Sequence, residues 1–220
     1  MTTPSPTPIA FKLPRYYPIL DTAASAARGF ETLAAAETLI DTGVRILQYR
    51  HKEAWTQRHF DEVKQLAKLC HEAGVLFVLN DRADYARLLG AALHVGQDDL
   101  SPVAARRVIS DEVIGFSTHN KQQLLRGDEE PVEYLSIGPI AATQSKLRPD
   151  PVVGIEGLRS LRALTAKPLV AIGGIDLLNA RDIISAGADS VAVISGLFPE
   201  TAQKKALKRR TEEWIRLLAI

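Results

Sequence analysis

Acidic residues follow two apolar runs at the points where each run is expected to end as a strand. The run 75–79 stops at Asn80 and Asp81, and the run 92–95 leads into Asp99. Because the C-terminal ends of parallel strands meet at one rim, the two carboxylates are expected to lie close together. Neighbouring carboxylates repel unless they share a proton or a cation, and Mg2+ prefers such oxygen ligands combined with substrate phosphates. Asp81 and Asp99 are therefore the predicted ligands of a Mg2+ cofactor.

The same residues also have a purely structural interpretation. Asn80-Asp81 is typical of a turn that leads into a helix cap, and Asp98 or Asp99 could cap a helix that starts near residue 102. What favours chemistry is that polar residues recur at the ends of other predicted strands.

Two cations and an amide alternate at the end of another apolar run, as Gln48, Arg50 and Lys52. In an extended segment this spacing turns all three side chains to one side. Arginine offers a planar fork of donors and lysine a point charge, and the two together suit a diphosphate. A solvated strand end with ordinary surface charges is the structural alternative. His51 would point the other way.

Glycines mark the last two strand ends, as Gly173-Gly174 and as Ile194-Ser195-Gly196. Glycine lets a phosphate approach backbone N–H groups at helix N-termini, and the loops after the last two strands of a parallel barrel are its usual phosphate site. Easing two tight turns is the alternative. With the basic rim, the pattern predicts two anion sites, which two phosphorylated substrates joined with loss of diphosphate would use.

Hydroxyl and basic groups also occur at and after the ends of the strands expected at 113–117 and 134–137. Ser117 could donate to a phosphate oxygen, whereas His119 is either an acid or base or a packed histidine, and packing is favoured. A long loop over 138–154 carries Thr143, Ser145 and Lys146. Loops of this length in compact barrels are commonly lids or binding elements, although a mobile surface loop would look the same.

The elements that would position these residues alternate along the whole chain. Strands are expected at 16–20, 44–50, 75–79, 92–95, 113–117, 134–137, 168–172 and 190–194. Helices are expected at 31–42, about 55–72, 82–89, 102–109, 121–126, 156–164, 177–186 and 202–218. This count predicts an α/β fold, a single (β/α)8 TIM barrel over residues 15–220, behind a disordered lead-in at 1–14. A doubly wound open sheet is the alternative.

The composition limits the classes of binding partner that the protein is expected to have. With 27 basic and 26 acidic residues the formal net charge is +1, which offers no footprint for nucleic acid or an anionic membrane. The single cysteine, Cys70, excludes a disulfide within one chain and favours a reducing compartment. The expectation is a cytoplasmic protein without a membrane segment. A homodimer is compatible with the sequence, which does not reveal the oligomeric state.

Seven motifs in order give the chain a resemblance to the thiamine-phosphate synthase family, from about Tyr17 to Gly196. They stand here as Gln48-x-Arg50-x-Lys52, Asn80-Asp81-Arg82, His94-x-Gly96-Gln97-x-Asp99, Gly115-x-Ser117-x-His119, Thr143-x-Ser145-Lys146, Gly173-Gly174 and Ile194-Ser195. Two departures from the family pattern are Ser145 in place of threonine and Ala141-Ala142 in place of Phe-Pro.

The resemblance implies a transferase that joins 4-amino-2-methyl-5-hydroxymethylpyrimidine diphosphate to 4-methyl-5-(2-hydroxyethyl)thiazole phosphate, by a dissociative reaction through a pyrimidine methyl cation. The residues implied for the pyrimidine diphosphate are Gln48, Arg50, Lys52, Asn80, Ser117 and Lys146. Those implied for the thiazole phosphate are Thr143, Ser145, Gly174, Ile194 and Ser195. Catalytic roles are implied for Arg50, Ser117 and Lys146, and magnesium binding for Asp81 and Asp99.

Two other functions are open at this point. The related thiazole tautomerase shares the barrel and the glycine phosphate site and could use His119 as its proton carrier, although it is poor in the acids that are intact here. A non-catalytic phosphate-binding barrel would bind ligand and make no product.

Overall fold

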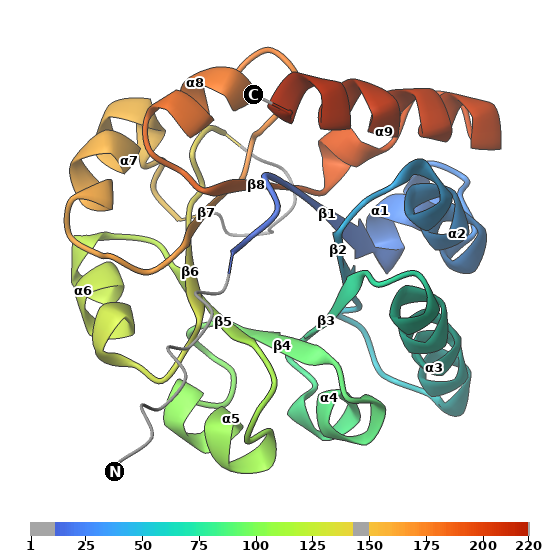
Figure 1. Ribbon diagram of the computed structural model, residues 1–220, viewed down its shortest axis with the longest axis horizontal. Coiled ribbons are helices and arrows are strands. Elements are labelled where there is room, and N and C mark those ends of the chain that lie inside the picture. The colour runs from blue at the N-terminus through green and yellow to red at the C-terminus, as the bar shows by residue number, and fades with distance from the viewer. Residues whose placement is uncertain (1–11, 143–149, 220) are drawn as a thin grey trace, which may run out of the picture.

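The computed structural model describes residues 12–142 and 150–219, and it is a closed barrel of eight parallel strands in the order β1 to β8. Figure 1 looks down this barrel, with the helices forming a ring outside the strands. The strands are β1 (Tyr16–Asp21), β2 (Ile46–Arg50), β3 (Leu76–Asn80), β4 (Ala92–Val95), β5 (Ile114–Thr118), β6 (Tyr134–Ile137), β7 (Leu169–Ile172) and β8 (Ser190–Val193). The predicted TIM barrel is confirmed, and an open sheet is excluded because β1 pairs with β8.

The outer ring contains the predicted helices with small shifts of their ends. They are α2 (Thr32–Thr42), α3 (Gln57–Glu72), α4 (Ala83–Leu89), α5 (Pro102–Val108), α6 (Lys121–Glu129), α7 (Gly154–Arg162), α8 (Ala180–Ser185) and α9 (Lys204–Leu218). Two short elements were not predicted, α1 (Thr22–Ala27) and the 3-10 helix η1 (Ser195–Leu197). Each is too short to show a helical period, and α1 exists because Asp21 caps it by accepting a hydrogen bond from Ala24 N at 2.9 Å.

Strand residues alternate between two apolar cores. The inner core, inside the barrel, includes Tyr17, Ile46, Val78 and Tyr134, and the outer core lies between strands and helices. This alternation is the period of two of a strand, so every second side chain enters the barrel. Leu13 belongs to the inner core and is buried, so packing starts inside the segment 1–14 that was expected to be a disordered lead-in. Residues 1–11 lie outside the described part of the chain.

The C-terminal helix α9 packs on its own barrel, beside α2 and α8 and across β1 (Figure 1). The Trp214 ring stacks on Tyr16 with 5.6 Å between ring centroids, and its Nε1 donates to Gly196 O at 3.1 Å. The helix therefore covers the outside of the β8–β1 seam and holds the backbone that follows β8.

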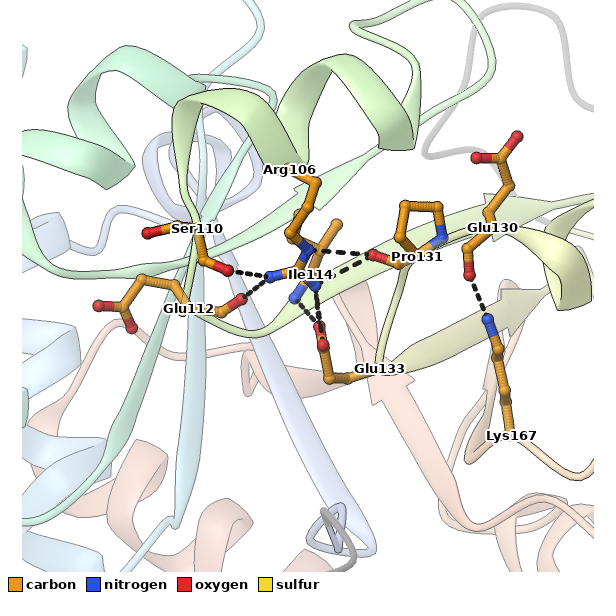
Figure 2. Close-up of polar contacts among 8 residues, drawn as sticks. All are labelled: Arg106, Ser110, Glu112, Ile114, Glu130, Pro131, Glu133 and Lys167. Carbon is orange, nitrogen blue, oxygen red and sulfur yellow. Dashed lines mark hydrogen bonds and ion pairs between the residues drawn. The ribbon is translucent and has the colours of Figure 1, made fainter. Parts of the chain in front are cut away.

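A polar cluster joins the N-terminal ends of β5 and β6, as Figure 2 shows. Arg106 of α5 donates to the carboxylate of Glu133 at 2.6 Å and to the carbonyls of Glu112 at 2.7 Å and Pro131 at 3.0 Å. Glu133 also accepts from Ile114 N at 2.7 Å. Ion pairing and backbone bonding together tie α5 to the starts of these two strands, at the end of the barrel opposite the rim where ligands bind in this fold.

Nothing in the described part of the chain combines the length and the apolar character that a helix needs to span a membrane.

Candidate active site

A cavity of about 880 Å3 opens at the C-terminal ends of the strands. It brings together the predicted site residues that the structure describes. These are Gln48, Arg50, Lys52, Asn80, Asp81, Asp99, Ser117, Gly174, Ile194 and Ser195. Segments more than a hundred residues apart in the chain thus meet at one opening, with the basic and acidic groups of β2 to β4 opposite the glycines of β7. The predicted Thr143, Ser145 and Lys146 lie outside the described residues.

The two cations of β2 each pair with an acid from a neighbouring strand end. Arg50 pairs with Asp21 at the end of β1, and the Lys52 Nζ lies 2.5 Å from Asp81 Oδ2. Lys52 is half exposed, whereas Arg50 is largely covered. His51 points away from the cavity, as expected, and its Nδ1 lies 2.8 Å from Thr22 Oγ1. Sequence reasoning missed Asp21, although its position at a strand end was a signal of the same kind.

Asp81 has an unusual backbone conformation. Its φ is +67°, the only positive φ at a non-glycine residue in the described chain. Such a conformation costs roughly 1–2 kcal/mol for an L-residue, and hydrogen bonds from Asp81 N to His94 O at 2.9 Å and from Ala83 N to Asp81 O at 3.1 Å help to hold it. Strain of this sort is common at functional sites, where the surrounding structure maintains it.

The carboxyls of Asp81 and Asp99 lie within hydrogen-bonding reach of each other, as the sequence predicted. Burial, together with the nearby Asp99, raises the pKa of Asp81 to about 6, against the lowering effect of Lys52. Asp99 itself accepts a hydrogen bond from Gly96 N at 2.8 Å. Ionisation of both acids is therefore costly in the free protein, which is the situation that a bound cation relieves.

This pair fits Mg2+ as a partial ligand set. No group of three or more His, Cys, Asp or Glu side chains that could hold a metal occurs within residues 12–142 and 150–219. Mg2+ commonly uses one or two carboxylates and takes its other oxygens from water and substrate phosphates. Two adjacent carboxylates open to a cavity therefore suit a metal that arrives with a phosphorylated substrate.

The capping alternatives for these acids are wrong. Ser101 caps α5 by accepting from Ala104 N at 3.3 Å, so neither Asp98 nor Asp99 does so. The residue at the N-cap of α4 is Arg82, and its side chain makes no capping hydrogen bond. Asn80 is buried at the cavity wall, and its Nδ2 has no hydrogen-bond partner within the described residues. A buried donor of this kind is satisfied when a ligand supplies an acceptor.

A buried polar chain reaches the cavity from inside the barrel. The His94 Nε2 lies 2.8 Å from Ser117 Oγ, and its Nδ1 lies 3.0 Å from the Tyr134 hydroxyl. Burial lowers the pKa of His94 to about 4, so the ring is neutral near pH 7. The sequence placed His94 in a motif without a role, and it gave no signal that Tyr17 and Tyr134, spaced as ordinary core residues, would extend this chain.

His119 is tied to the β6–α7 connection. Its Nδ1 lies 2.8 Å from Gly138 O and 3.7 Å from Asp150 Oδ2. The ring is mostly covered and still lines the cavity. It is therefore a positioned rim histidine, in agreement with the favoured packing interpretation.

The glycine side of the cavity depends on close backbone approach. Gly174 has a φ of +66°, and a Cβ there would lie 2.7 Å from the backbone of Ala141 and Ala142. Ala141 N donates to Gly173 O at 3.0 Å, so the β6–α7 connection runs directly over these glycines. The expectation of helix N-terminal amides is only half right. The short helix η1 starts at Ser195, but α8 starts only at Ala180, because an Asp176 turn intervenes.

Comparison with known proteins gives a consistent result. The family described as "Thiamine monophosphate synthase" matches residues 16–197. A "Thiamine-phosphate synthase" of Koribacter versatilis (strain Ellin345) is 48% identical over 197 residues, which is 88% of this chain and 93% of the relative. One of Chloroflexus aurantiacus is 40% identical and covers 83% of this chain and 84% of the relative. A solved "Thiamine phosphate pyrophosphorylase" from Pyrococcus furiosus has a TM-score of 0.81 at 28% identity, over 93% of this chain and 95% of the other.

Proposed function

The chain belongs to the thiamine monophosphate synthase family and is a transferase that forms thiamine phosphate from small pyrimidine and thiazole substrates, and we propose how its cavity does so. The substrates are the aminopyrimidine diphosphate and the thiazole phosphate, and diphosphate is released. The observation that carries the proposal is that one cavity joins a rim of cations and paired carboxylates to a wall of glycine backbone.

The pyrimidine diphosphate is bound at the ends of β2 to β5. Arg50 and Lys52 supply positive charge, and Asn80 Nδ2 is a buried donor that awaits an acceptor. Ser117 donates to the departing diphosphate. Arg50 and Lys52 already pair with Asp21 and Asp81, and further carboxylates line the described cavity, so acids outnumber cations there. A diphosphate therefore needs further positive charge, which Lys146 of the loop and a cation would supply.

Mg2+ is the proposed cation, held by Asp81 and Asp99. When bound, it neutralises phosphate charge and makes diphosphate a better leaving group. The protein's part is to keep two carboxylates adjacent at the rim. Keeping both ionised costs free energy, as the raised pKa of Asp81 indicates. Lys52, 2.5 Å from Asp81, offsets some of that cost before the substrate arrives.

The thiazole phosphate is bound on the opposite wall. Gly174, Ile194 and Ser195 line it, and the missing side chain at Gly174 lets a phosphate meet backbone N–H groups. Thr143 and Ser145, which lie outside the described residues, are proposed to bind the thiazole phosphate as well. The ring nitrogen of the thiazole then faces the carbon that loses diphosphate.

The reaction is proposed to be dissociative. The C–O bond to diphosphate breaks first and leaves a pyrimidine methyl cation, and the thiazole nitrogen lone pair then forms the new C–N bond. Such a sequence needs leaving-group stabilisation and positioning more than a general base. The site matches this need, since cations, amides and hydroxyls line it beside the two carboxylates proposed for the cation, and its buried histidine is neutral.

The metal assignment is tested with Asp99→Asn, with Asp98→Asn as its matched control. Both are incubated with the two phosphorylated substrates across a Mg2+ titration, and thiamine phosphate is measured by mass. Asp99→Asn should raise the Mg2+ concentration for half-maximal rate by about tenfold or more, while the exposed Asp98 should leave it unchanged. Equal Mg2+ dependence in the two variants would remove Asp99 from the metal site.

The dissociative step is tested separately. The pyrimidine substrate carries 18O in the ester oxygen that joins its methylene carbon to the α-phosphorus, and it is incubated with protein, Mg2+ and an unreactive thiazole phosphate analogue. Reversible C–O cleavage scrambles the label into non-bridging positions. Retention of all label in the ester oxygen, in protein that makes thiamine phosphate, would favour a concerted displacement.

We also propose that the protein works in the cytoplasm, which its buried free thiol at Cys70 supports. The homodimer that the sequence leaves open stays a prediction.

A further inference from the structure

A continuous chain of hydrogen bonds crosses the barrel interior and joins two groups of the cavity wall. Gln48 Nε2 donates to the Tyr17 hydroxyl at 2.8 Å, and the Tyr17 and Tyr134 hydroxyls lie 2.9 Å apart. Tyr134 is 3.0 Å from His94 Nδ1, and His94 Nε2 is 2.8 Å from Ser117 Oγ. The first four residues are buried, and Gln48 and Ser117, at the two ends, line the cavity, as do Tyr17 and His94 between them.

With Gln48 Nε2 facing the Tyr17 hydroxyl, as the structure places it, the protons in this chain run in one direction. The Tyr17 oxygen accepts from Gln48, and within the described residues the acceptor for its own proton is Tyr134. Tyr134 then donates its single proton to His94 Nδ1. A neutral imidazole has one acceptor and one donor nitrogen, so His94 Nε2 carries the hydrogen and donates to Ser117. The opposite direction requires the Gln48 amide to turn over, so that its Oε1 accepts from Tyr17.

The direction of the hydrogen bonds decides whether each end of the chain presents a donor or an acceptor to the cavity. Ser117 Oγ accepts from His94 and also from Ser136 Oγ at 3.3 Å, so its lone pairs are occupied and its own proton points to a ligand. At the other end Gln48 uses its N–H toward Tyr17. Its Oε1 takes no part in this chain of hydrogen bonds and is left for the cavity that Gln48 lines.

We propose that Tyr17, Tyr134 and His94 are positioning residues that set Gln48 as an acceptor and Ser117 as a donor toward one substrate. The substrate that fits has an amino group at the Gln48 end and an anionic oxygen at the Ser117 end. This inference rests on the proposed function, in which an aminopyrimidine diphosphate occupies this wall. It adds that the two contacts are coupled, because reversing one hydrogen bond reverses the others.

The fold makes room for the chain at one glycine. Gly115 is opposite Tyr134 in the β5–β6 register, and a Cβ at Gly115 would lie 2.0 Å from the Tyr134 ring. The His94 ring stacks on Tyr134 with 5.5 Å between centroids, and Tyr17 meets it edge-on at 6.2 Å. Packing therefore fixes the ring orientations that the hydrogen bonds require.

The first test is the tautomer of His94 in the wild-type protein, read from 15N and 1H correlations of its imidazole near pH 7. The signals are assigned among the five histidines by their loss in His94→Gln. The chain requires a hydrogen on Nε2 and a bare Nδ1. A hydrogen on Nδ1 reverses the direction and overturns the proposal. This readout needs no substrate and no activity, so it stands whatever becomes of the proposed function.

The second test measures selectivity between the natural aminopyrimidine diphosphate and an analogue with an oxo group in place of the amino group. The wild type should prefer the amino compound, since an oxo group facing Gln48 Oε1 sets two acceptors against each other. In Tyr17→Phe the amide loses its partner and can turn over, so the ratio of kcat/KM values should fall about tenfold. An unchanged ratio in a Tyr17→Phe protein that still forms thiamine phosphate overturns the proposal while leaving the function intact.

Tyr16→Phe is the matched control. Tyr16 neighbours Tyr17 but packs in the outer core against Trp214, and its buried hydroxyl has no hydrogen-bond partner within the described residues. Its removal should leave selectivity unchanged, and a tenfold loss there would show that any lost hydroxyl has this effect. The double variant of Tyr17→Phe with Tyr134→Phe should match the single variants, since one break interrupts the chain. Additive losses would mean two independent contacts and overturn the coupling.

Discussion

Replacing Asp81 by asparagine should stabilise the metal-free protein at high pH while abolishing its response to Mg2+. Asparagine keeps the shape of the carboxyl and tolerates the left-handed backbone found here at φ +67°. It also removes the charge whose ionisation is opposed by burial and by Asp99. Lys52 loses its partner, but its half-exposed ammonium returns to water at little cost.

The magnitude follows from the pKa. A rise from 3.8 to about 6 corresponds to about 3 kcal/mol. Asp81 still contacts the open cavity, where water screens its charge, so we expect about half of this, about 1.5 kcal/mol. Because the folded state has the higher pKa, the stabilisation by protonated Asp81 is fully present below about pH 3.8 and is lost as the pH rises through about 6. The asparagine variant has no such loss.

The assay is urea unfolding of both proteins in a chelator, at about pH 4 and about pH 8. The variant should gain about 1.5 kcal/mol over the wild type between the two pH values. Addition of Mg2+ at the higher pH should then stabilise the wild type and leave Asp81→Asn unaffected. The raised pKa of Asp81 would be refuted if the stability difference between variant and wild type were the same at both pH values, or if the wild type were more stable than the variant at about pH 8. The electrostatic argument for a metal at Asp81 would then fail too.

Two further predictions address the glycine wall of the cavity and the N-terminal end of the barrel. Gly174→Ala should raise the KM for the thiazole phosphate by about tenfold or more, because the backbone is left-handed there and a Cβ would lie 2.7 Å from Ala141. Binding of the pyrimidine diphosphate, measured by calorimetry, should change little. Equal losses of affinity for both ligands would contradict a separate phosphate-binding wall. Arg106→Met should lower the free energy of unfolding by about 2 kcal/mol, because the Glu133 carboxylate loses its cationic partner and the carbonyl of Pro131 loses its donor. The kcat should be unchanged, and an unchanged urea midpoint would show that the Arg106 contacts in Figure 2 contribute nothing.

The architecture was predictable because the apolar periodicity of a strand or a helix can be read from a short stretch of sequence. Apolar runs of strand length that alternate with capped helical segments indicated the barrel, and parallel connectivity then places every strand end at one rim. That is why Gln48, Asp81, Asp99 and Gly174 could be assigned to a common opening before any coordinates were known. The short helices α1 and η1 were missed because six and three residues are too few to display a helical repeat.

The partners of those residues were a different matter, since contact between side chains depends on register and on which way each ring or amide turns. The residues next to Arg50 in the sequence do not predict its ion pair with Asp21. Those next to Gln48 do not predict hydrogen bonds that lead through Tyr17 and Tyr134 to His94. The strained φ of Asp81 is likewise a result of the bonds made around it. The sequence by itself determined which chemical groups reach the rim, because strand period and connectivity are local properties. Only the tertiary structure decided their charges, donors and acceptors, because these depend on burial and on neighbours that are remote in the chain.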